Sequence, residues 1–249
     1  MQCTPNLAGE VAVVTGGTRN IGLAIARTLA AHGASVCVTG QADQAALERA
    51  LATLTADGAQ ATGLLGDVAD PQIAQRVFDQ AEGALGGPVS ILVNGAASRP
   101  HTPLLEIEPD EWNAVLGTVL GGAFYMAQRL FARLPAERKG AVVNLGGLSA
   151  HRPAVDRPHV IAAKTGLEGL TRALAEEGLG RIRANCIVPG AIETERRPGQ
   201  SAPHKAEQGP ARMTGTSEDV AAAVLPFCDP TQSYVTGQTV HVDGGRYMP

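Results

Sequence analysis

The stretch that decides the fold is Val11-Ala-Val-Val-Thr15 together with the turn that follows it, Thr15-Gly16-Gly17-Thr18-Arg19-Asn20-Ile21-Gly22. An apolar, β-branched run that leads into a glycine-rich turn and then into an amphipathic segment predicts a strand, a tight turn and a helix N-terminus. Free backbone N–H groups and the positive end of the helix dipole meet at such a turn. We therefore predict a pyrophosphate-binding site there, formed by Gly16, Thr18, Arg19, Asn20, Ile21 and Gly22.

The rest of the chain repeats this alternation of short apolar runs and longer helical patterns. We expect strands at 11–15, 35–39, 61–65, 89–93, 141–145, 185–188 and 239–242. We expect helices at 21–32, 41–57, 71–83, 109–134, 159–178 and 217–227. Most of the strands are apolar throughout, which is typical of a sheet covered on both faces. The pattern predicts an α/β fold, a Rossmann-type doubly wound seven-stranded parallel sheet in three α/β/α layers, with residues 1–249 forming a single domain.

The segment 193–215 breaks this rhythm, because it is polar, contains three prolines and has no sustained apolar period. It follows the sixth predicted strand, at the carboxyl edge where open α/β sheets bind ligands. Long irregular loops in compact domains are often functional lids. We therefore predict a mobile substrate lid over these residues.

Composition and charge narrow the class of protein. A hydrophobic content of 44% excludes disorder. The net charge of −4 and the lack of a basic run give no electrostatic basis for binding nucleic acid or an anionic membrane, so a small-molecule substrate is expected. Cys3, Cys37, Cys186 and Cys228 form no Cys-x-x-Cys pair, which favours reduced thiols in the cytoplasm and suggests no metal site. The first ten residues predict no signal peptide, and Ala114–Ala127 is too short to span a bilayer.

Several motifs at the ends of the predicted strands resemble those of the short-chain dehydrogenase/reductase (SDR) family. The first turn is similar to the family fingerprint Thr-Gly-x-x-x-Gly-x-Gly, with Asn20 in place of the middle glycine. Asparagine is the non-glycine residue that best tolerates a left-handed backbone, so we expect the turn to survive. The other matching motifs are Gly66-Asp67-Val68, Asn94-Gly95-Ala96, Pro189-Gly190-Ala191-Ile192-Glu193-Thr194 and the C-terminal run from Thr236 to Gly245.

The resemblance implies a dinucleotide cofactor and assigns residues to it. Asp67 and Val68 match the pair that holds the adenine, and Asn94, Gly95 and Ala96 match the motif after the fourth strand. The residues that match the nicotinamide side are Pro189, Gly190, Ile192 and Thr194.

Cofactor preference depends on the end of the second strand, where an acid would accept the ribose 2′-OH of NAD. The sequence there is Thr39-Gly40-Gln41, with no acid to repel a 2′-phosphate. Arg19 resembles the arginine that NADP-preferring relatives carry in the first turn. NADP(H) is therefore favoured over NAD(H), with Gln41 beside the adenosine ribose.

The catalytic centre departs from the family pattern, which is an Asn-Ser-Tyr-Lys tetrad. Lys164 matches the lysine and is expected to bind the ribose hydroxyls, but the tyrosine position is Val160. The serine position is Gly147 and the asparagine position is Val119. Hydride addition to a carbonyl develops an alkoxide that needs a proton, so the usual proton relay cannot operate here.

Three nearby side chains are candidate substitutes for the proton donor, Ser149, His151 and His159. Ser149 would point inward if the fifth strand continued to it. His159 lies about 140° around the predicted helix from Lys164 and would face the site only if that helix began later. Of the three tyrosines, only Tyr247 has a route to a site, and that route is from a neighbouring subunit.

Three functions remain open. The first is an SDR-like NADP(H)-dependent oxidoreductase with a non-standard proton donor, acting on a small apolar carbonyl, imine or conjugated substrate. The second is a non-redox enzyme on the same scaffold, catalysing cyclisation, dehydration or isomerisation in a pocket made apolar by Val119, Gly147 and Val160. The third is a catalytically silent partner subunit. The apolar segment Ala114–Leu134 and the last strand resemble the surfaces by which SDR proteins form homodimers and homotetramers.

Overall fold

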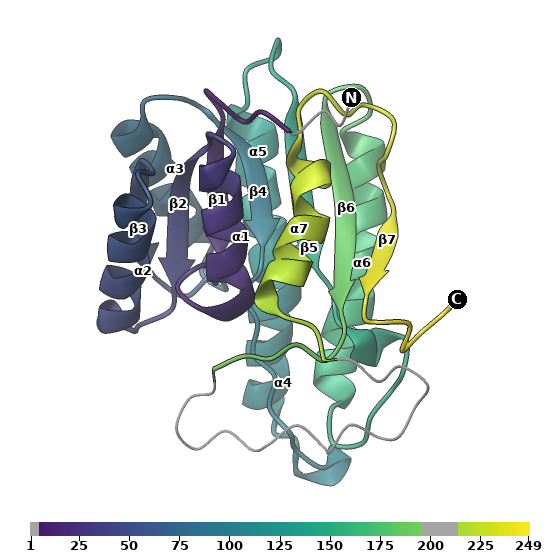
Figure 1. The fold of residues 1–249 in the computed structure, drawn as a ribbon. Helices are drawn as coiled ribbons and strands as arrows, with labels where there is room; N and C mark the ends of the chain where they lie inside the picture. Colours follow the sequence, from purple (N-terminus) through teal and green to yellow (C-terminus); the bar gives the residue numbers. More distant parts are fainter. Residues whose placement is uncertain (1–4, 196–213) are drawn as a thin grey trace.

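The computed structural model describes residues 5–195 and 214–249, which form one parallel sheet with the strand order β3-β2-β1-β4-β5-β6-β7 (Figure 1). The strands are β1 (Val11–Thr15), β2 (Ser35–Gly40), β3 (Ala61–Leu65), β4 (Val89–Asn94), β5 (Gly140–Leu145), β6 (Ile182–Pro189) and β7 (Thr239–Val242). Chain order reverses between β1 and β4, so the crevice outside their carboxyl ends is the expected ligand site of a doubly wound sheet. The predicted fold class is confirmed.

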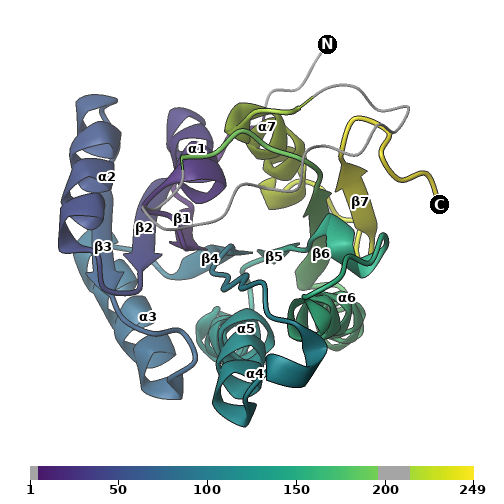
Figure 2. The ribbon, with the colours of Figure 1, turned by 90° about the horizontal axis from the view of Figure 1, so that it is seen from below.

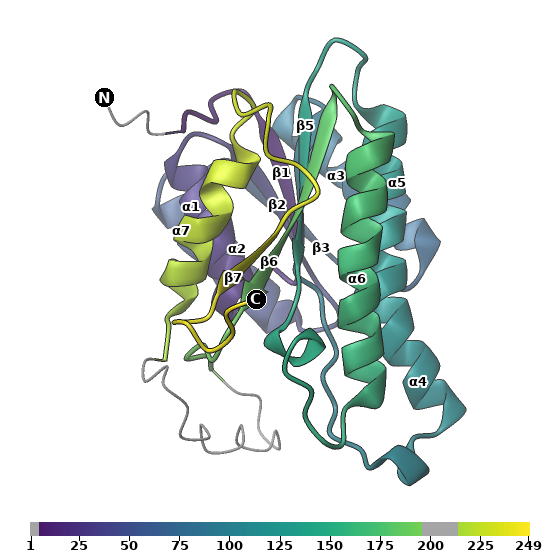
Figure 3. The same ribbon diagram turned by 90° about the vertical axis from the view of Figure 1, so that its right-hand side faces the viewer.

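Two layers of helices cover the sheet. One face carries α1 (Asn20–Ala31), α2 (Gln44–Ala56) and α7 (Ser217–Cys228), and the other carries α3 (Pro71–Leu85), α4 (Pro109–Leu116), α5 (Gly122–Arg133) and α6 (Pro158–Glu177) (Figure 2). Figure 3 shows the sheet edge-on between these layers, with α1 and α7 on one side and α5 and α6 on the other. Among the described residues, no helix has the length and apolarity needed to cross a membrane.

The core explains why the strands are apolar throughout. Val14 and Val93 pack with α1 and α7 on one face of the sheet, while Val13 and Leu92 pack with α3 and α5 on the other. Successive residues of a strand point to opposite faces, so a strand buried on both faces needs apolar side chains at both parities.

Three predicted elements differ most from the structure, and the bounds of the others lie within two residues of the prediction. The helix expected from Gln41 begins at Gln44, because the Asp43 carboxylate caps α2 by accepting a hydrogen bond from the Ala46 N–H at 3.0 Å. The helix expected over 109–134 is interrupted by a π-helical turn, Gly117–Gly121, between α4 and α5. The strand expected over 185–188 is longer, because β6 pairs with β5 from Ile182 onward.

Candidate active site

The first turn and the end of β4 lie in contact. Gly16 has a φ of +67°, and a Cβ added there would lie 2.9 Å from the Gly95 carbonyl oxygen. The Thr15 hydroxyl accepts hydrogen bonds from the backbone N–H groups of Gly95, at 3.0 Å, and Ala96, at 3.2 Å. The fold thus brings together two predicted cofactor motifs that are far apart in the sequence.

Asn20 occupies the left-handed conformation predicted for it, with a φ of +48°. Its side chain also forms a reciprocal pair with the backbone of Glu195: Nδ2 donates to the Glu195 carbonyl at 3.0 Å, and Oδ1 accepts from the Glu195 N–H at 2.9 Å. A glycine at this position could not form these bonds. The replacement therefore ties the phosphate-binding turn to the segment after β6, a contact that the sequence analysis missed.

We expect Asn20→Gly to release Glu195 while leaving the turn intact. Glycine adopts positive φ at little cost, so the relief of backbone strain offsets part of the lost hydrogen bonding. Hydrogen exchange at the Glu195 amide should accelerate by about tenfold, as expected for the loss of one net hydrogen bond of about 1.4 kcal/mol. The Glu193 amide, which donates to the Gly215 carbonyl at 2.9 Å, is the internal control and should keep its protection. Unchanged exchange at Glu195 would contradict this role of Asn20.

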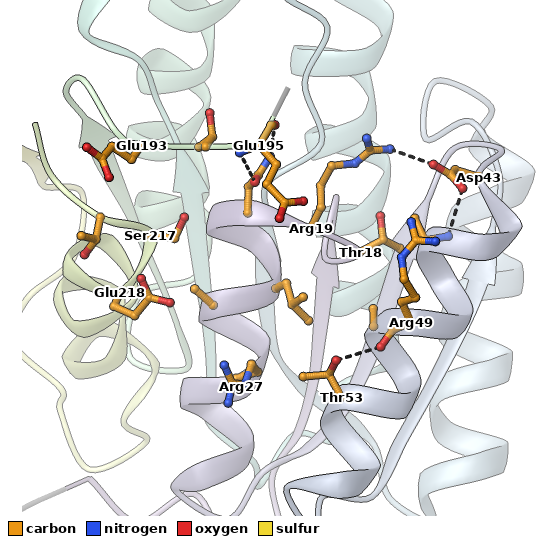
Figure 4. A pocket seen from close by; sticks show the side chains of 17 residues that line it. Thr18, Arg19, Arg27, Asp43, Arg49, Thr53, Glu193, Glu195, Ser217 and Glu218 are labelled. Atoms are coloured by element: carbon orange, nitrogen blue, oxygen red, sulfur yellow. Dashed lines mark hydrogen bonds and ion pairs between the residues drawn. The ribbon is translucent and has the colours of Figure 1, made fainter. Parts of the chain in front are cut away.

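The adenosine end of the predicted site carries an acid that the sequence analysis overlooked. Arg19 lies 3.5 Å from the Asp43 carboxylate, and Figure 4 shows its guanidinium directed toward that residue. A hollow of about 900 Å³ lies beside Arg19 between α1, α2 and the start of α7. Thr39-Gly40-Gln41 holds no acid, as predicted, but the helix cap two residues later supplies one. A 2′-phosphate at Arg19 would therefore compete with Asp43.

Gln41, Asp67 and Val68 lie next to one another at the same edge. The Gln41 side chain donates to the Asp67 carboxylate at 3.2 Å, and that carboxylate also accepts the Ala69 N–H at 3.0 Å. Val68 is buried, and a Cβ at Gly122 would lie 2.7 Å from its side chain. Asp67 is thus held in place by the protein itself.

A buried polar chain runs from the end of β4 to α6. The Asn94 side chain donates to Asn144 at 2.8 Å, and Asn144 donates to the Thr171 hydroxyl at 2.9 Å. Among the described residues, the Asn94 side-chain oxygen has no hydrogen-bond partner. Buried acceptors are seldom left unpaired, so this oxygen is available to a bound group at the crevice.

Lys164 lies beneath the carboxyl end of β5. Its side chain is buried, and its ammonium donates a hydrogen bond to the Leu145 carbonyl at 2.5 Å. Burial, with a smaller contribution from the positive charge of Arg99, lowers the pKa of Lys164 to about 8. An ammonium has three donors, and the Leu145 carbonyl takes one of them.

The three positions at which the motif match predicts missing polar groups differ in their surroundings. Val119, in the π-helical turn, and Val160, in the first turn of α6, are buried in one apolar cluster with Ala163 and Leu167. Gly147 lies against Lys164, and a Cβ there would sit 3.5 Å from the Lys164 Cγ, an ordinary contact. The positions matched to the tyrosine and the asparagine are thus filled with packed hydrocarbon, whereas a side chain could be added at the position matched to the serine.

Neither condition under which Ser149 or His159 would face the site is met. Ser149 is in a short 3₁₀ turn (Leu148–Ala150), because β5 ends at Leu145, so the strand that would have pointed it inward does not continue. His159 is fully buried in the first turn of α6, and its Nε2 lies 3.0 Å from the Glu111 carboxylate on α4. His159 therefore faces α4.

His151 belongs to a cluster at the outer edge of the sheet. Its Nε2 lies 2.8 Å from the Glu168 carboxylate, and its ring packs against His241, at 4.4 Å between centroids, and Tyr247, at 4.9 Å. Burial, then the neighbouring His151, lower the pKa of His241. Tyr247 was expected to approach a site only from a neighbouring subunit, but the structure packs it on His151 of its own chain.

The segment after β6 lies along the same edge. Gly190 is required there, because a Cβ would lie 2.6 Å from the Asp243 backbone. Ile192 pairs with Gly215, and Thr194 is partly buried. Most of the predicted lid, residues 196–213, lies outside the described residues.

The described residues fit a dinucleotide. Gly16 allows a close backbone approach, Asn20 opens α1 with free N–H groups, and Asn94 and Lys164 offer an acceptor and a donor across the crevice. No three His, Cys, Asp or Glu side chains within residues 5–195 and 214–249 are grouped as metal ligands would be.

Comparison with known proteins gives the family. The enoyl-(acyl carrier protein) reductase family model matches residues 16–246. The 3-oxoacyl-[acyl-carrier-protein] reductase FabG of Escherichia coli (strain K12) is 34% identical over 247 residues, which cover 98% of this chain and 99% of that protein. FabG of Pseudomonas aeruginosa is 35% identical with the same coverage. The chain belongs to the short-chain dehydrogenase/reductase family.

Solved structures agree with this assignment. A short-chain alcohol dehydrogenase structure from Sinorhizobium meliloti 1021 superposes with a TM-score of 0.88 at 32% identity and covers 97% of each chain. The SDR glucose/ribitol dehydrogenase structure from Brucella melitensis gives 0.85 at 27% identity, covering 99% of this chain and 100% of that one. This SDR chain is therefore related along its whole length to oxidoreductases.

Proposed function

We propose that this SDR protein is an NADP(H)-dependent oxidoreductase that acts on a carbonyl, imine or conjugated acceptor with a non-standard proton donor. The observation that carries the proposal is that the matched cofactor positions lie at the carboxyl edge of neighbouring strands: Gly16 follows β1, Asn94 ends β4, and Lys164 binds the last residue of β5. They are present although the position matched to the tyrosine is Val160. The names of the FabG relatives, which are reductases, support a redox reaction.

When bound, the nicotinamide supplies or accepts the hydride. Lys164 and Asn94 would hold the ribose side, and Asp67 and Val68 the adenine. The residues that would face the nicotinamide are Pro189, Gly190, Ile192 and Thr194. The first turn, with its helix N-terminus, would bind the pyrophosphate.

Lys164 is the described group best suited to give up the proton. It is buried beside the open Gly147 position, and its pKa of about 8 lies close to the range in which a general acid works. His151 and His159 are each held against a glutamate, and Ser149 lies beyond the end of β5. In the reductive direction, activity should therefore fall as the pH rises through about 8, since Lys164 loses its proton.

The decisive experiment is single-turnover oxidation of bound NADPH. The full chain is mixed with NADPH and then with members of a carbonyl, imine and enone panel in a stopped-flow instrument, and absorbance at the nicotinamide band is followed. The proposal expects loss of the band with at least one substrate, with one product formed per NADPH consumed. If NADPH binds but no member of the panel oxidises it, the redox proposal fails.

Cofactor preference gives a separate prediction at Arg19. Arg19→Gln should weaken NADPH binding by about tenfold, since one charged hydrogen bond to the 2′-phosphate of about 1.4 kcal/mol is lost. NADH affinity should change little. Arg27→Gln is the matched control, because Arg27 lines the same hollow but pairs with Asp57 at 2.8 Å. Fluorescence titration measures the affinity of each variant for NADPH and for NADH. Equal losses of affinity for the two cofactors would refute the assignment of Arg19 to the 2′-phosphate.

A non-redox enzyme is the second candidate, and the packing of Val119 and Val160 in one apolar cluster favours it. With Val119, Gly147 and Val160 at the other three matched positions, Lys164 is the one tetrad residue that the sequence keeps. Turnover without any change in nicotinamide absorbance would select this candidate. A silent partner subunit would show no turnover of its own.

We also propose a cytoplasmic homodimer or homotetramer. Cys37, Cys186 and Cys228 are free and buried, and burial raises the pKa of each thiol to about 12, which suits a reducing compartment. Trp112 on α4 and Phe124 on α5 keep 38% and 44% of their surface exposed, as interface residues of a free subunit would. Sedimentation analysis tests the oligomer.

A further inference from the structure

Two loops at the carboxyl edge are joined to each other beside Lys164. One follows β4 and the other precedes α6, and both lie below the lower ends of the strands in Figures 1 and 3. The Thr102 N–H donates to the Asp156 carbonyl at 2.8 Å. The Arg157 Nε donates to the His101 Nδ1 at 3.2 Å. These contacts fix Arg157 against the loop that carries Arg99.

The two arginines and Lys164 form one group of positive charges. The two hydrogen bonds between the loops hold Arg157 against the segment that carries Arg99. In agreement with this arrangement, the positive charge of Arg99, in addition to burial, lowers the pKa of both Lys164 and Arg157. Arg99 is exposed to solvent, and Arg157 is partly buried. A ligand that enters the crevice can therefore reach both guanidinium groups.

These three cations differ from the four arginines that pair with a carboxylate. In the described ranges 5–195 and 214–249, no carboxylate forms an ion pair with Arg99, Arg157 or Lys164. By contrast, Arg19, Arg27, Arg133 and Arg138 each lie within 3.5 Å of one. Placing three cations together without an acid is electrostatically unfavourable, and an anionic ligand would remove that cost.

We propose that Arg99 and Arg157, beside Lys164, bind an oxyanion of the substrate, a carboxylate or a phosphate group. The inference rests on the proposed function, because it names the substrate class of the same site. Guanidinium groups match both oxyanions through paired hydrogen bonds. The cofactor pyrophosphate does not explain them, because the turn that would hold it opens α1 on the opposite face of the sheet from α6.

Binding can be measured without turnover, because a ketone and NADP⁺ are both oxidised and no hydride can move between them. The wild-type chain with NADP⁺ is titrated with acetoacetate and with its neutral methyl ester, and binding is read by saturation-transfer NMR. A second pair, (2-oxopropyl)phosphonate and its dimethyl ester, separates carboxylate from phosphate recognition. The same titrations are repeated with Arg99→Gln, Arg157→Gln and, as control, Arg152→Gln, whose side chain instead donates to the Arg246 carbonyl at 3.0 Å.

We expect at least one anion to bind about tenfold more tightly than its ester, and either arginine variant to lose most of that preference. Arg152→Gln should retain it, and added salt should weaken only the anion. Arg99→Lys and Arg157→Lys keep the charge and should retain part of the preference, which separates charge from loop packing. Equal binding of both anions and their esters, or a preference unchanged in both Gln variants, would overturn the proposal. Either result leaves the redox proposal to be judged by NADPH oxidation alone.

Discussion

Lys164→Met is expected to make the protein more stable and inactive. The wild-type chain buries an ammonium whose pKa falls from 10.5 to about 8. Each pKa unit corresponds to about 1.4 kcal/mol, so the folded state carries a cost of up to about 3 kcal/mol at neutral pH. Methionine fills a similar volume without the charge. The variant loses the hydrogen bond to the Leu145 carbonyl, which destabilises it by about 1 kcal/mol. The net increase in the free energy of unfolding is therefore about 1–2 kcal/mol, or a few degrees in Tm.

The pH dependence of this difference identifies its cause. Because the folded-state pKa of Lys164 is lowered, its cost is fully present below pH 8 and disappears as the pH rises toward 10.5. The stability advantage of the methionine variant should shrink over that window. Cys37 and Cys228 titrate in both proteins, so they cancel in the difference. Cys186 interacts with Lys164, but its pKa of about 12 in the folded wild-type chain lies above this window. Urea unfolding of both proteins at several pH values measures this.

A matching loss of activity is required for the proposed role of Lys164. Lys164→Met should abolish NADPH oxidation, since it removes both the ribose donor and the proposed acid. Lys164→Arg keeps a donor but cannot release a proton near neutral pH, so it should bind NADPH and fail in turnover. A methionine variant that is stable and fully active would contradict the assignment.

Gly22→Ala is expected to disable the phosphate-binding turn. A Cβ at Gly22 would lie 2.2 Å from the Gly16 carbonyl oxygen, and both groups belong to the backbone of one tight turn. The turn must shift to admit a methyl group, which costs about 2 kcal/mol or more and moves the N–H groups that would face the pyrophosphate. We expect NADPH affinity to fall at least about tenfold and Tm to fall by about 4–8 °C.

Gly83→Ala is the matched control. Gly83 lies within α3, is exposed, and has open space around its Cβ position. Alanine should stabilise this helix by about 0.5–1 kcal/mol, and the same gain in helix propensity applies at Gly22. The difference between the two variants therefore isolates the contact with Gly16. If Gly22→Ala bound NADPH as well as the wild type, the turn would not have the predicted role.

The sequence by itself determined the fold and the first turn. A strand buried on both faces must be apolar at successive positions, so β1 could be predicted to the residue. The edge strands β3 and β7 are only partly buried, and their bounds were also predicted to the residue. The left-handed Asn20 could be predicted as well, because backbone conformation depends on local sterics. The prediction that Val160 stands at the tyrosine position likewise needs only the spacing to Lys164. Each of these properties depends on residues that are adjacent in the chain.

Only the tertiary structure decided the partners of the polar and charged side chains. His159 faces Glu111, His151 faces Glu168, Arg19 faces Asp43, and Asn20 holds Glu195, and none of these pairs is a pattern in the sequence. The grouping of Arg99, Arg157 and Lys164 likewise depends on two loops that meet at one edge of the sheet. The physical reason is that a side chain's partner and pKa depend on distance in space. The distance between two side chains is set by the order of the parallel strands in the sheet and not by their spacing along the chain.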